Sequence, residues 1–313
     1  WINGPNLSGI LISAVIARLL AGVVLAWFCH REITAGQPTG FDRGEAIELL
    51  KYGGWVNMTS VIGPILFMTD RFLIGGVLGA KAVTDYTVPF QLANRTAILP
   101  GSLVTALFPR LSAVGPEEQE HLSQVATLAV VCLLSPLFVG GIFIMGPFLT
   151  AWVGGQVSPV SLVVGRVLLL AMWANALGLV AFTRLQASGR PDTVSKIMLA
   201  EIPPYLLLLG GGAYLAGLLG CAVVTAIRSV IDTLLLTWFA NRRIPAWRLV
   251  AAELAIVCLA VWLAGLWTIS DWRWWAASAT LVSLSAVIAG VSAPAELRER
   301  IVQRLPVLRL RPR

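Results

Sequence analysis

The sequence predicts an all-α, polytopic membrane protein, a helix bundle with about nine transmembrane helices. Of its 313 residues, 57% are hydrophobic and only 12% are charged, and the mean hydropathy is +0.81. A soluble domain carries about 25% charged residues, so this chain has too few charges to cover a surface that faces water. The composition therefore excludes a cytosolic enzyme, a nucleic-acid-binding protein and a disordered scaffold.

Apolar stretches of sufficient length define the expected transmembrane helices. The hydrocarbon core of a bilayer is about 30 Å thick and needs about 20 mainly apolar residues per helix. The stretches that meet this length are 7–29, 53–77, 85–109, 124–146, 160–182, 195–217, 219–240, 247–268 and 272–293. A very short, glycine-bearing link joins 195–217 to 219–240, which predicts an antiparallel helical hairpin. Prolines inside the spans predict kinks, at Pro64, Pro89, Pro100, Pro136, Pro203 and Pro204.

The distribution of positive charge predicts the orientation of the chain. The formal net charge is +7, which in a membrane protein reports topology and anionic lipid rather than nucleic acid. If residues 30–52 are cytoplasmic, the loops on that side hold most of the loop Lys and Arg residues, and only Lys81 and Arg273 lie outside. The positive-inside rule then puts the basic tail, residues 295–313, in the cytoplasm, where it contacts membrane lipids.

The long connection over residues 31–52 has the pattern of a short amphipathic helix. Asp42 and Glu45 form a D-x-x-E capping pattern. Three apolar residues that follow fall on one helical face: Ala46, Leu49 and Leu50. We expect this helix to lie at the cytoplasmic interface, to lead into the span that begins at Gly53, and to separate two helical bundles.

Sequence motifs for enzymatic or nucleotide-driven chemistry are absent. The chain has no G-x-x-x-x-G-K-[ST] loop, no G-x-S-x-G elbow and no H-E-x-x-H motif. His30 and His121 are far apart, and no cysteine belongs to a C-x-x-C pair. We therefore expect neither an enzyme nor a metal site, and no cofactor.

Charged residues inside the apolar spans are the strongest candidates for a functional site. They are Arg18, Arg71, Arg95, Arg166 and Arg228, together with Asp70 and Asp232. An arginine at a helix centre costs about 2.5–3.5 kcal/mol on insertion scales, so each should face protein or water rather than lipid. The excess of arginine over aspartate predicts a cationic, water-accessible cavity. Such a cavity suits an anionic group such as a pyrophosphate, which arginine binds through paired hydrogen bonds.

These charged residues also have structural interpretations. Arg228 and Asp232 are spaced i, i+4 and can pair along one helix face. Asp70 can pair with Arg95, because the two spans run antiparallel through a short link. Arg166 has no evident partner, which favours cavity lining, although its long side chain can also extend to the interface. The sequence alone leaves both kinds of interpretation open.

Three stretches resemble the polysaccharide flippases that move O-antigens and other lipid-linked oligosaccharides. The first, residues 50–112, contains an Asp-Arg pair, an Ile-Gly, a Leu-Gly, a Tyr that opens the next helix and a Phe-Pro: Asp70-Arg71, Ile74-Gly75, Leu78-Gly79, Tyr86 and Phe108-Pro109. The second, LQASGRPDTVSK from Leu185, is similar to a Leu-Gln-Ala-x-Gly-Arg loop of the family. The third, GLLGCAVVTAI from Gly217, is similar to a Gly-x-x-Gly-Ala-Ala pattern of the family.

The resemblance implies the multidrug/oligosaccharidyl-lipid/polysaccharide exporter superfamily, whose members alternate between inward-open and outward-open states around a central cavity. On this template the chain holds the last helix of a first bundle, a cytoplasmic linker with the amphipathic helix, a second bundle, two additional transmembrane helices and a basic tail: residues 1–30, 31–52, 53–243, 244–294 and 295–313. Because the chain begins at Trp1 rather than Met, we expect the rest of the first bundle to be missing.

The function implied by the resemblance is that of a flippase in the bacterial inner membrane. It would move a polyprenyl-pyrophosphate-linked oligosaccharide from the cytoplasmic to the outer leaflet, for surface polysaccharides such as lipopolysaccharide. The pyrophosphate would be bound by Arg71, Arg95, Arg166, Arg228 and Arg18, and the arginines would be restrained by Asp70 and Asp232. Expected partners are this lipid-linked oligosaccharide and membrane lipids, with a polysaccharide polymerase and glycosyltransferases as further candidates, and no nucleic acid.

Two alternatives remain at this point. A cation-coupled multidrug exporter of the same superfamily would favour acidic and aromatic residues over arginines in its cavity. A membrane-embedded polysaccharide polymerase or glycosyltransferase would need large outer loops with paired carboxylates, whereas the longest outer loop expected here runs only from about Gly146 to Pro159.

Overall fold

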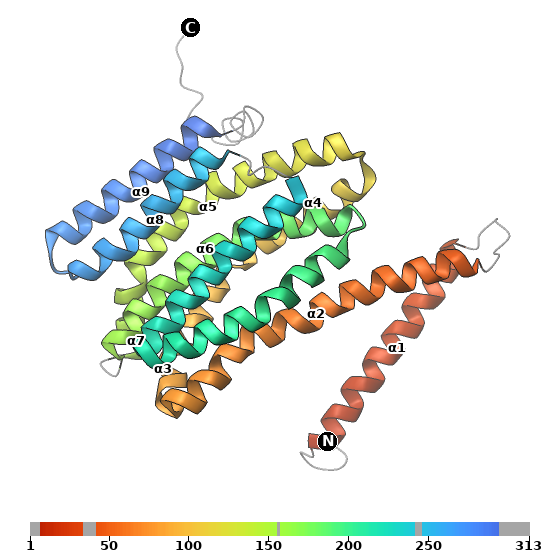
Figure 1. Cartoon of the computed structure of the whole chain (residues 1–313), viewed down its shortest axis with the longest axis horizontal. Helices are drawn as coiled ribbons and strands as arrows, with labels where there is room; N and C mark the ends of the chain where they lie inside the picture. The colour runs from red at the N-terminus through yellow and green to blue at the C-terminus, as the bar shows by residue number, and fades with distance from the viewer. Residues whose placement is uncertain (1–6, 34–41, 155–156, 242–245, 294–313) are drawn as a thin grey trace, which may run out of the picture. The chain divides into compact units, whose positions relative to one another are not determined.

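The computed structural model describes residues 7–33, 42–154, 157–241 and 246–293. Within these ranges the chain is helical and contains no strand, which confirms the all-α class. The helices are α1 (Leu7–Ile33), α2 (Arg43–Leu78), α3 (Ala80–Arg95), α4 (Ile98–Ala113), α5 (Pro116–Val153), α6 (Pro159–Ala187), α7 (Pro191–Asn241), α8 (Trp247–Leu266) and α9 (Trp272–Ser292) (Figure 1). The chain divides into two compact units, residues 1–51 and residues 52–313, and each is described by itself.

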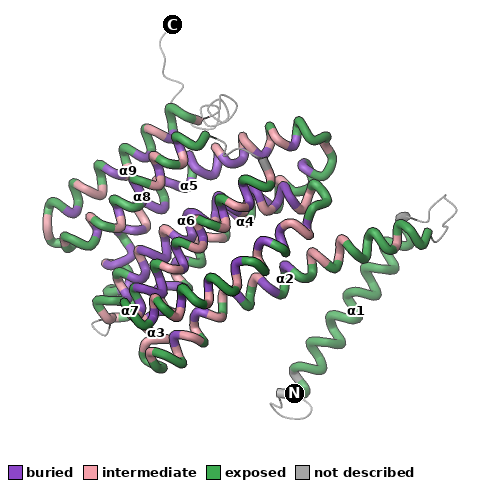
Figure 2. Tube along the Cα trace, in the orientation of Figure 1, coloured by how far each residue is buried: buried purple, intermediate pink, exposed green. Residues whose placement is uncertain are grey.

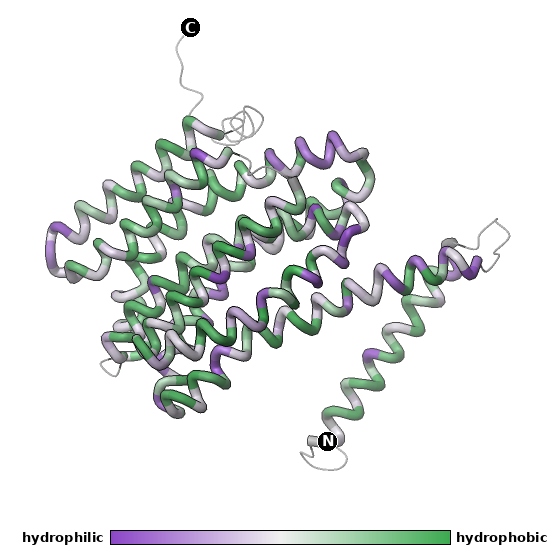
Figure 3. The backbone as a smooth tube through the Cα atoms, viewed as in Figure 1, coloured by the Kyte–Doolittle hydropathy of each residue, from purple (hydrophilic) through white to green (hydrophobic). Residues whose placement is uncertain are grey.

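Helix α1 is apolar and exposed along its described length (Figures 2 and 3). Its stretch Leu11–Arg31 has a mean hydropathy of 2.2 and no buried residue. Leu25, for example, is 65% exposed. Exposing this apolar surface to water would be unfavourable, whereas the hydrocarbon core of a bilayer would accommodate it. Helix α1 therefore has the composition of a transmembrane helix.

Seven of the described helices are long and apolar enough to span a membrane: α1, α2, α5, α6, α7, α8 and α9. Large apolar side chains on their outer faces remain exposed, such as Phe72 on α2 and Leu207 on α7. This arrangement confirms the polytopic membrane bundle expected from the composition.

Helix α7 is a hairpin of two arms, residues 191–216 and residues 218–241. Its 51 residues include one non-helical position, Gly217, with φ 58° and ψ −138°. These torsions are open to glycine and strained for other residues. Past this point the arms run antiparallel and touch closely, since a Cβ at Gly220 would collide with the carbonyl of Gly212. The hairpin expected from the short link is therefore confirmed.

The span expected over residues 85–109 is wrong, because the structure divides it into α3 and α4. Each of these helices has 16 residues, and they are separated at Thr96 and Ala97. Thr96 Oγ1 donates to the Ala93 carbonyl at 2.6 Å and so satisfies an acceptor at the end of α3. Pro100 lies in the first turn of α4 and has no N–H to offer the Thr96 carbonyl, so a continuous helix would lose a hydrogen bond there.

The amphipathic helix and the span from Gly53, expected as two elements, form one continuous helix, α2. The capping expected at Asp42 is present, with its Oδ1 accepting from Gly44 N at 2.6 Å and from Glu45 N at 3.4 Å. Ile47, Leu49 and Leu50 are exposed. Gly53 and Gly54 are compatible with helical geometry, and no proline stands before Pro64 to end the helix.

Helix α6 lies at the centre of the second unit and packs against α3, α4, α5, α7 and α8. Figure 2 shows buried positions concentrated on α5 and α6. Helices α8 and α9 pack beside α5 (Figure 1), where Phe143 and Trp274 meet edge to face with ring centroids 5.6 Å apart. The second arm of α7 lies tightly against α6, because Thr233 Oγ1 donates to the Ala174 carbonyl at 2.7 Å.

The contact between α6 and α7 predicts the effect of Gly178→Ala. A Cβ at Gly178 would lie 2.7 Å from Thr233 Oγ1 and 3.3 Å from Thr233 Cα, so the two helices must separate. We expect the free energy of unfolding to fall by about 1–3 kcal/mol, measured by denaturation in mixed micelles. Gly54→Ala is the control, because its Cβ would meet no atom within 4 Å. Equal stability of the two variants would contradict the tight contact.

Candidate functional site

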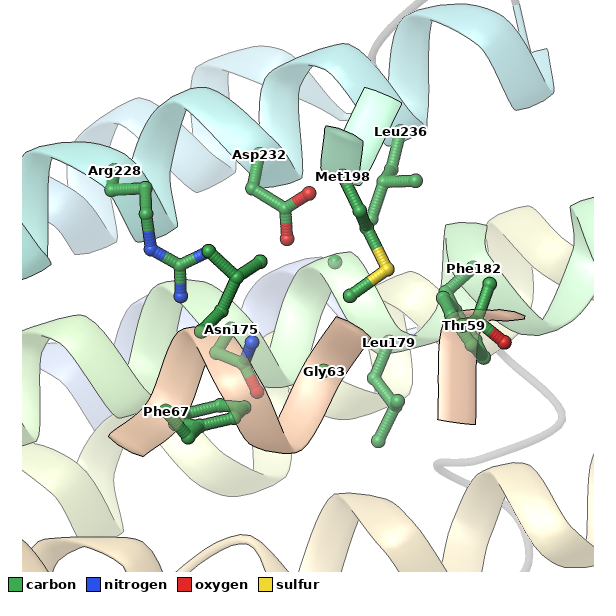
Figure 4. A pocket seen from close by; sticks show the side chains of 12 residues that line it. Thr59, Gly63, Phe67, Asn175, Leu179, Phe182, Met198, Arg228, Asp232 and Leu236 are labelled. Atoms are coloured by element: carbon green, nitrogen blue, oxygen red, sulfur yellow. The ribbon is translucent and has the colours of Figure 1, made fainter. Parts of the chain in front are cut away.

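The candidate site is a cavity of about 210 Å³ between α2, α6 and α7 (Figure 4). Most of its wall is apolar, which holds the few polar groups in a medium of low dielectric constant. The lining residues are Thr59, Gly63, Leu66, Phe67, Asn175, Gly178, Leu179, Phe182, Met198, Arg228, Asp232 and Leu236. Arg228 and Asp232 come from the second arm of α7 and supply the charge.

Arg228 lies between the two arms of α7 and pairs with Glu201. Its Nη1 is 3.5 Å from Glu201 Oε2, and the two side chains are 12% and 8% exposed. The guanidinium also lies over the ring of Tyr205, 5.0 Å from its centroid. The pairing with Asp232 proposed from the i, i+4 spacing is thus replaced by a pair across the hairpin, although Arg228 still interacts electrostatically with Asp232.

Glu201 and Asp232 lie on opposite arms of α7, and both carboxyl groups interact electrostatically with Arg228. Glu201 Oε1 and Asp232 Oδ1 are buried and have no hydrogen-bond partner among the described residues. One guanidinium therefore faces two buried acids, and the cluster keeps polar atoms that no protein group satisfies.

Asp70 belongs to a neighbouring polar cluster between α2, α3 and α7. It is 1% exposed, and its Oδ1 accepts from Arg71 N at 2.8 Å. Its carboxyl group also interacts with the hydroxyl of Tyr86, which is fully buried. Tyr86 and Tyr205 both approach Thr225 Oγ1, at 3.2 Å and 3.5 Å. This chain of hydroxyl groups connects Asp70 to the α7 hairpin.

Arg71 and Arg95 have different surroundings. Arg71 is half-buried, donates from Nη1 to the Phe67 carbonyl at 2.8 Å and lies 4.3 Å from the centroid of the Phe90 ring. Arg95 is exposed and lines an open depression at the α3–α4 break. Asp70 interacts with Arg71 and Arg228, and Arg95 is not among its partners.

Arg166 and Arg18 are not among the residues that line this cavity. Arg166 lines a separate cavity of about 400 Å³ between α5, α6, the α8–α9 turn and α9. Arg18 is exposed on α1, in the first unit. Of the seven predicted residues, the structure therefore brings Asp70, Arg71, Arg228 and Asp232 into connected clusters. The described part of the chain has no group of three or more His, Cys, Asp or Glu residues that could hold a metal ion.

Glu201 is the residue of this site that the sequence analysis missed. It lies near one end of its apolar span, residues 195–217. The signal that could have identified it is the hairpin, because Glu201 precedes Gly217 by about as many residues as Asp232 follows it. Two antiparallel arms with this turn bring the two acids opposite each other.

The ion pair across the hairpin predicts a strong coupling between Glu201 and Arg228. Removing one partner leaves a buried uncompensated charge, so Glu201→Gln and Arg228→Gln should each lower the free energy of unfolding by about 3 kcal/mol. The double variant should lose clearly less than the sum of the two. The exposed pair Lys196–Asp192 (2.7 Å) is the control and should show almost no coupling in the same denaturation measurement. Additive losses for the buried pair would contradict the assignment.

Comparison with known proteins finds similarity to proteins of polysaccharide biosynthesis. The family model described as "Polysaccharide biosynthesis protein" matches residues 1–114. The putative O-antigen transporter of Shigella flexneri is 30% identical over 238 residues, which cover 76% of this chain and 57% of that protein. These similarities confirm the resemblance indicated by the motifs.

Two further relatives match at lower identity. The probable low-salt glycan biosynthesis flippase Agl15 of Haloferax volcanii is 24% identical over 249 residues, covering 75% of this chain and 51% of that protein. The uncharacterized membrane protein EpsK of Bacillus subtilis is 24% identical over 252 residues, covering 77% and 48%. The chain thus spans about half the length of the curated relatives it matches. No solved structure matches it.

Proposed function

We propose that this chain, a relative of the polysaccharide flippases, works as a membrane transporter rather than an enzyme. It moves a polyprenyl-pyrophosphate-linked oligosaccharide from the cytoplasmic to the outer leaflet of the bacterial inner membrane by alternating access. Relatives named as an O-antigen transporter and as a glycan biosynthesis flippase support this proposal. The seven helices that are long and apolar enough to cross a membrane are consistent with a transporter.

The observation that carries the proposal is the incompletely satisfied guanidinium of Arg228 at the cavity. Charge-assisted hydrogen bonds from guanidinium to carboxylate are usually about 2.7–2.9 Å long, whereas the distance from Arg228 to Glu201 is 3.5 Å. Arg228 Nε is buried without a partner. The guanidinium therefore has donors available for phosphate oxygens, and the apolar wall of the cavity strengthens that attraction.

In the proposed mechanism the pyrophosphate competes with Glu201 for Arg228. When the substrate enters, its oxygens accept hydrogen bonds from Arg228 in place of Glu201 Oε2. Release of the substrate restores the ion pair between the two arms of α7. Arg71 assists as a second cation beside Asp70, and Asp70 and Asp232 restrain the two arginines.

Arg95 and Arg18 are proposed to attract the anionic head group before it reaches Arg228, since both side chains are exposed. We also propose the domain division that the family resemblance implies. In it, residues 1–30 are the last helix of a first bundle, 31–52 are a linker, 53–243 are the second bundle, and 244–294 are two additional transmembrane helices. The proposed cytoplasmic tail, residues 295–313, lies outside the described residues. A polysaccharide polymerase and glycosyltransferases are the proposed partners on either side of the transport step.

The experiment uses the intact protein in bacteria that lack their own lipid-linked-oligosaccharide flippase. The readout is the amount of lipid-linked sugar that stays on the cytoplasmic face, at equal membrane abundance of each variant. Wild type should restore export, and Arg228→Gln should reduce it at least about tenfold, because a charge-assisted contact with the substrate is lost. Lys196→Gln is the control, because Lys196 is exposed, does not line the Arg228 cavity and is not part of the Arg228 ion pair.

Normal export by both variants would remove Arg228 from the mechanism. Failure of the wild type together with efflux of cationic drugs by the same cells would overturn the flippase proposal itself. The proposal predicts that wild type and Lys196→Gln restore export and that Arg228→Gln does not.

A further inference from the structure

A second cavity, of about 400 Å³, lies at the end of the bundle where α8 turns into α9. Its wall combines the last turns of α5 with part of α6, the α8–α9 turn and the start of α9. Arg166 contributes the charge, and Trp267 and Trp274 contribute large aromatic surfaces. This cavity shares no lining residue with the Arg228 cavity.

Arg166 fits into a space that two glycines leave open. A Cβ at Gly146 on α5 would lie 3.0 Å from Arg166 Nη2, and a Cβ at Gly265 on α8 would lie 3.4 Å from Nη1. A larger residue at Gly146 would therefore require the guanidinium to shift. The two glycines leave room for this planar group, which has five donors, at the wall of the cavity.

The guanidinium of Arg166 has no protein partner in the part of the chain that the structure describes. Its Nε is buried without a hydrogen bond, and none of the ion pairs of the described residues includes it. Asp271, the acid at the nearby α8–α9 turn, instead caps α9, accepting from Arg273 N at 3.0 Å. A half-buried cation without an acid is unfavourable, so an anionic ligand would stabilise it.

The surroundings favour a lipid as the source of that anion. Large apolar side chains near the cavity are exposed on α5, α8 and α9, including Trp152, Leu266 and Trp272. Tryptophans gather at this end of the bundle, as they do at the level of lipid head groups. Acyl chains can cover these apolar faces while a head-group phosphate reaches Arg166.

We propose that the Arg166 cavity binds the phosphodiester of an anionic phospholipid, such as phosphatidylglycerol. The lipid completes the packing of α8 and α9 on α5, because its head group fills the cavity beside Arg166. The site is separate from the one proposed for the transported substrate, and its occupancy does not depend on transport.

Native mass spectrometry of the purified intact protein, with phosphatidylglycerol as the probe, tests this site. Arg166→Gln removes the charge and keeps a hydrogen-bonding side chain. Arg273→Gln is the matched control, because it removes the same charge from an exposed residue at the same end of the bundle. We expect the dissociation constant of the first bound lipid to rise about tenfold in Arg166→Gln and less than about twofold in Arg273→Gln.

Gly146→Ala gives an independent measurement if Arg166→Gln fails to fold. It keeps Arg166 but displaces the flexible end of its side chain, so lipid binding should again weaken several-fold. In a further arm, inorganic phosphate replaces the lipid, and we expect no bound phosphate at concentrations where phosphatidylglycerol saturates the protein.

Three results would overturn the proposal. The first is equal loss of lipid binding in Arg166→Gln and Arg273→Gln, which would indicate general surface charge. The second is unchanged binding in whichever of Arg166→Gln and Gly146→Ala fold. The third is inorganic phosphate binding as tightly as the lipid with the same dependence on Arg166, which would indicate a site for a free anion. Each readout is independent of flippase activity.

Discussion

The close antiparallel contact between the two arms of α7 is the constraint on which the candidate site depends. Gly217 reverses the chain, and Gly212 and Gly220 let the arms approach backbone to backbone. This register brings Glu201 on the first arm to Arg228 on the second. Without it, an acid and a base far apart in the sequence would each be a buried, unpaired charge, which a membrane protein can scarcely accommodate.

The polar groups at the hairpin are connected rather than isolated. Thr225 lies between Tyr86 and Tyr205, and Tyr86 continues to Asp70 on α2. Contacts with α6 hold the second arm in place, through Thr233 and the Ala174 carbonyl. A ligand that draws Arg228 away from Glu201 therefore acts on a network that joins α2, α3, α6 and α7, which is what coupling between binding and helix movement requires.

The sequence predicts the fold well, because lipid imposes length and hydropathy on each span. The hairpin, the cap at Asp42 and the apolar α1 all follow from local patterns. A kink at Pro100 was expected, but the division of the span into α3 and α4 at Thr96 and Ala97 was not, since hydropathy does not distinguish a kinked helix from two helices. The charged residues were identified by their cost in lipid, but Glu201 and the separate position of Arg166 depend on tertiary packing that no periodicity encodes.

Binding of a short isoprenyl pyrophosphate to the purified intact protein tests the central claim most directly. The affinity is compared with that of the isoprenyl alcohol of equal length, in wild type and in Arg228→Gln. The account predicts that the wild type binds the pyrophosphate at least about tenfold more tightly than the alcohol, and that this preference is largely lost in Arg228→Gln. An equal preference in both proteins would contradict it, because the anionic group would then be recognised elsewhere.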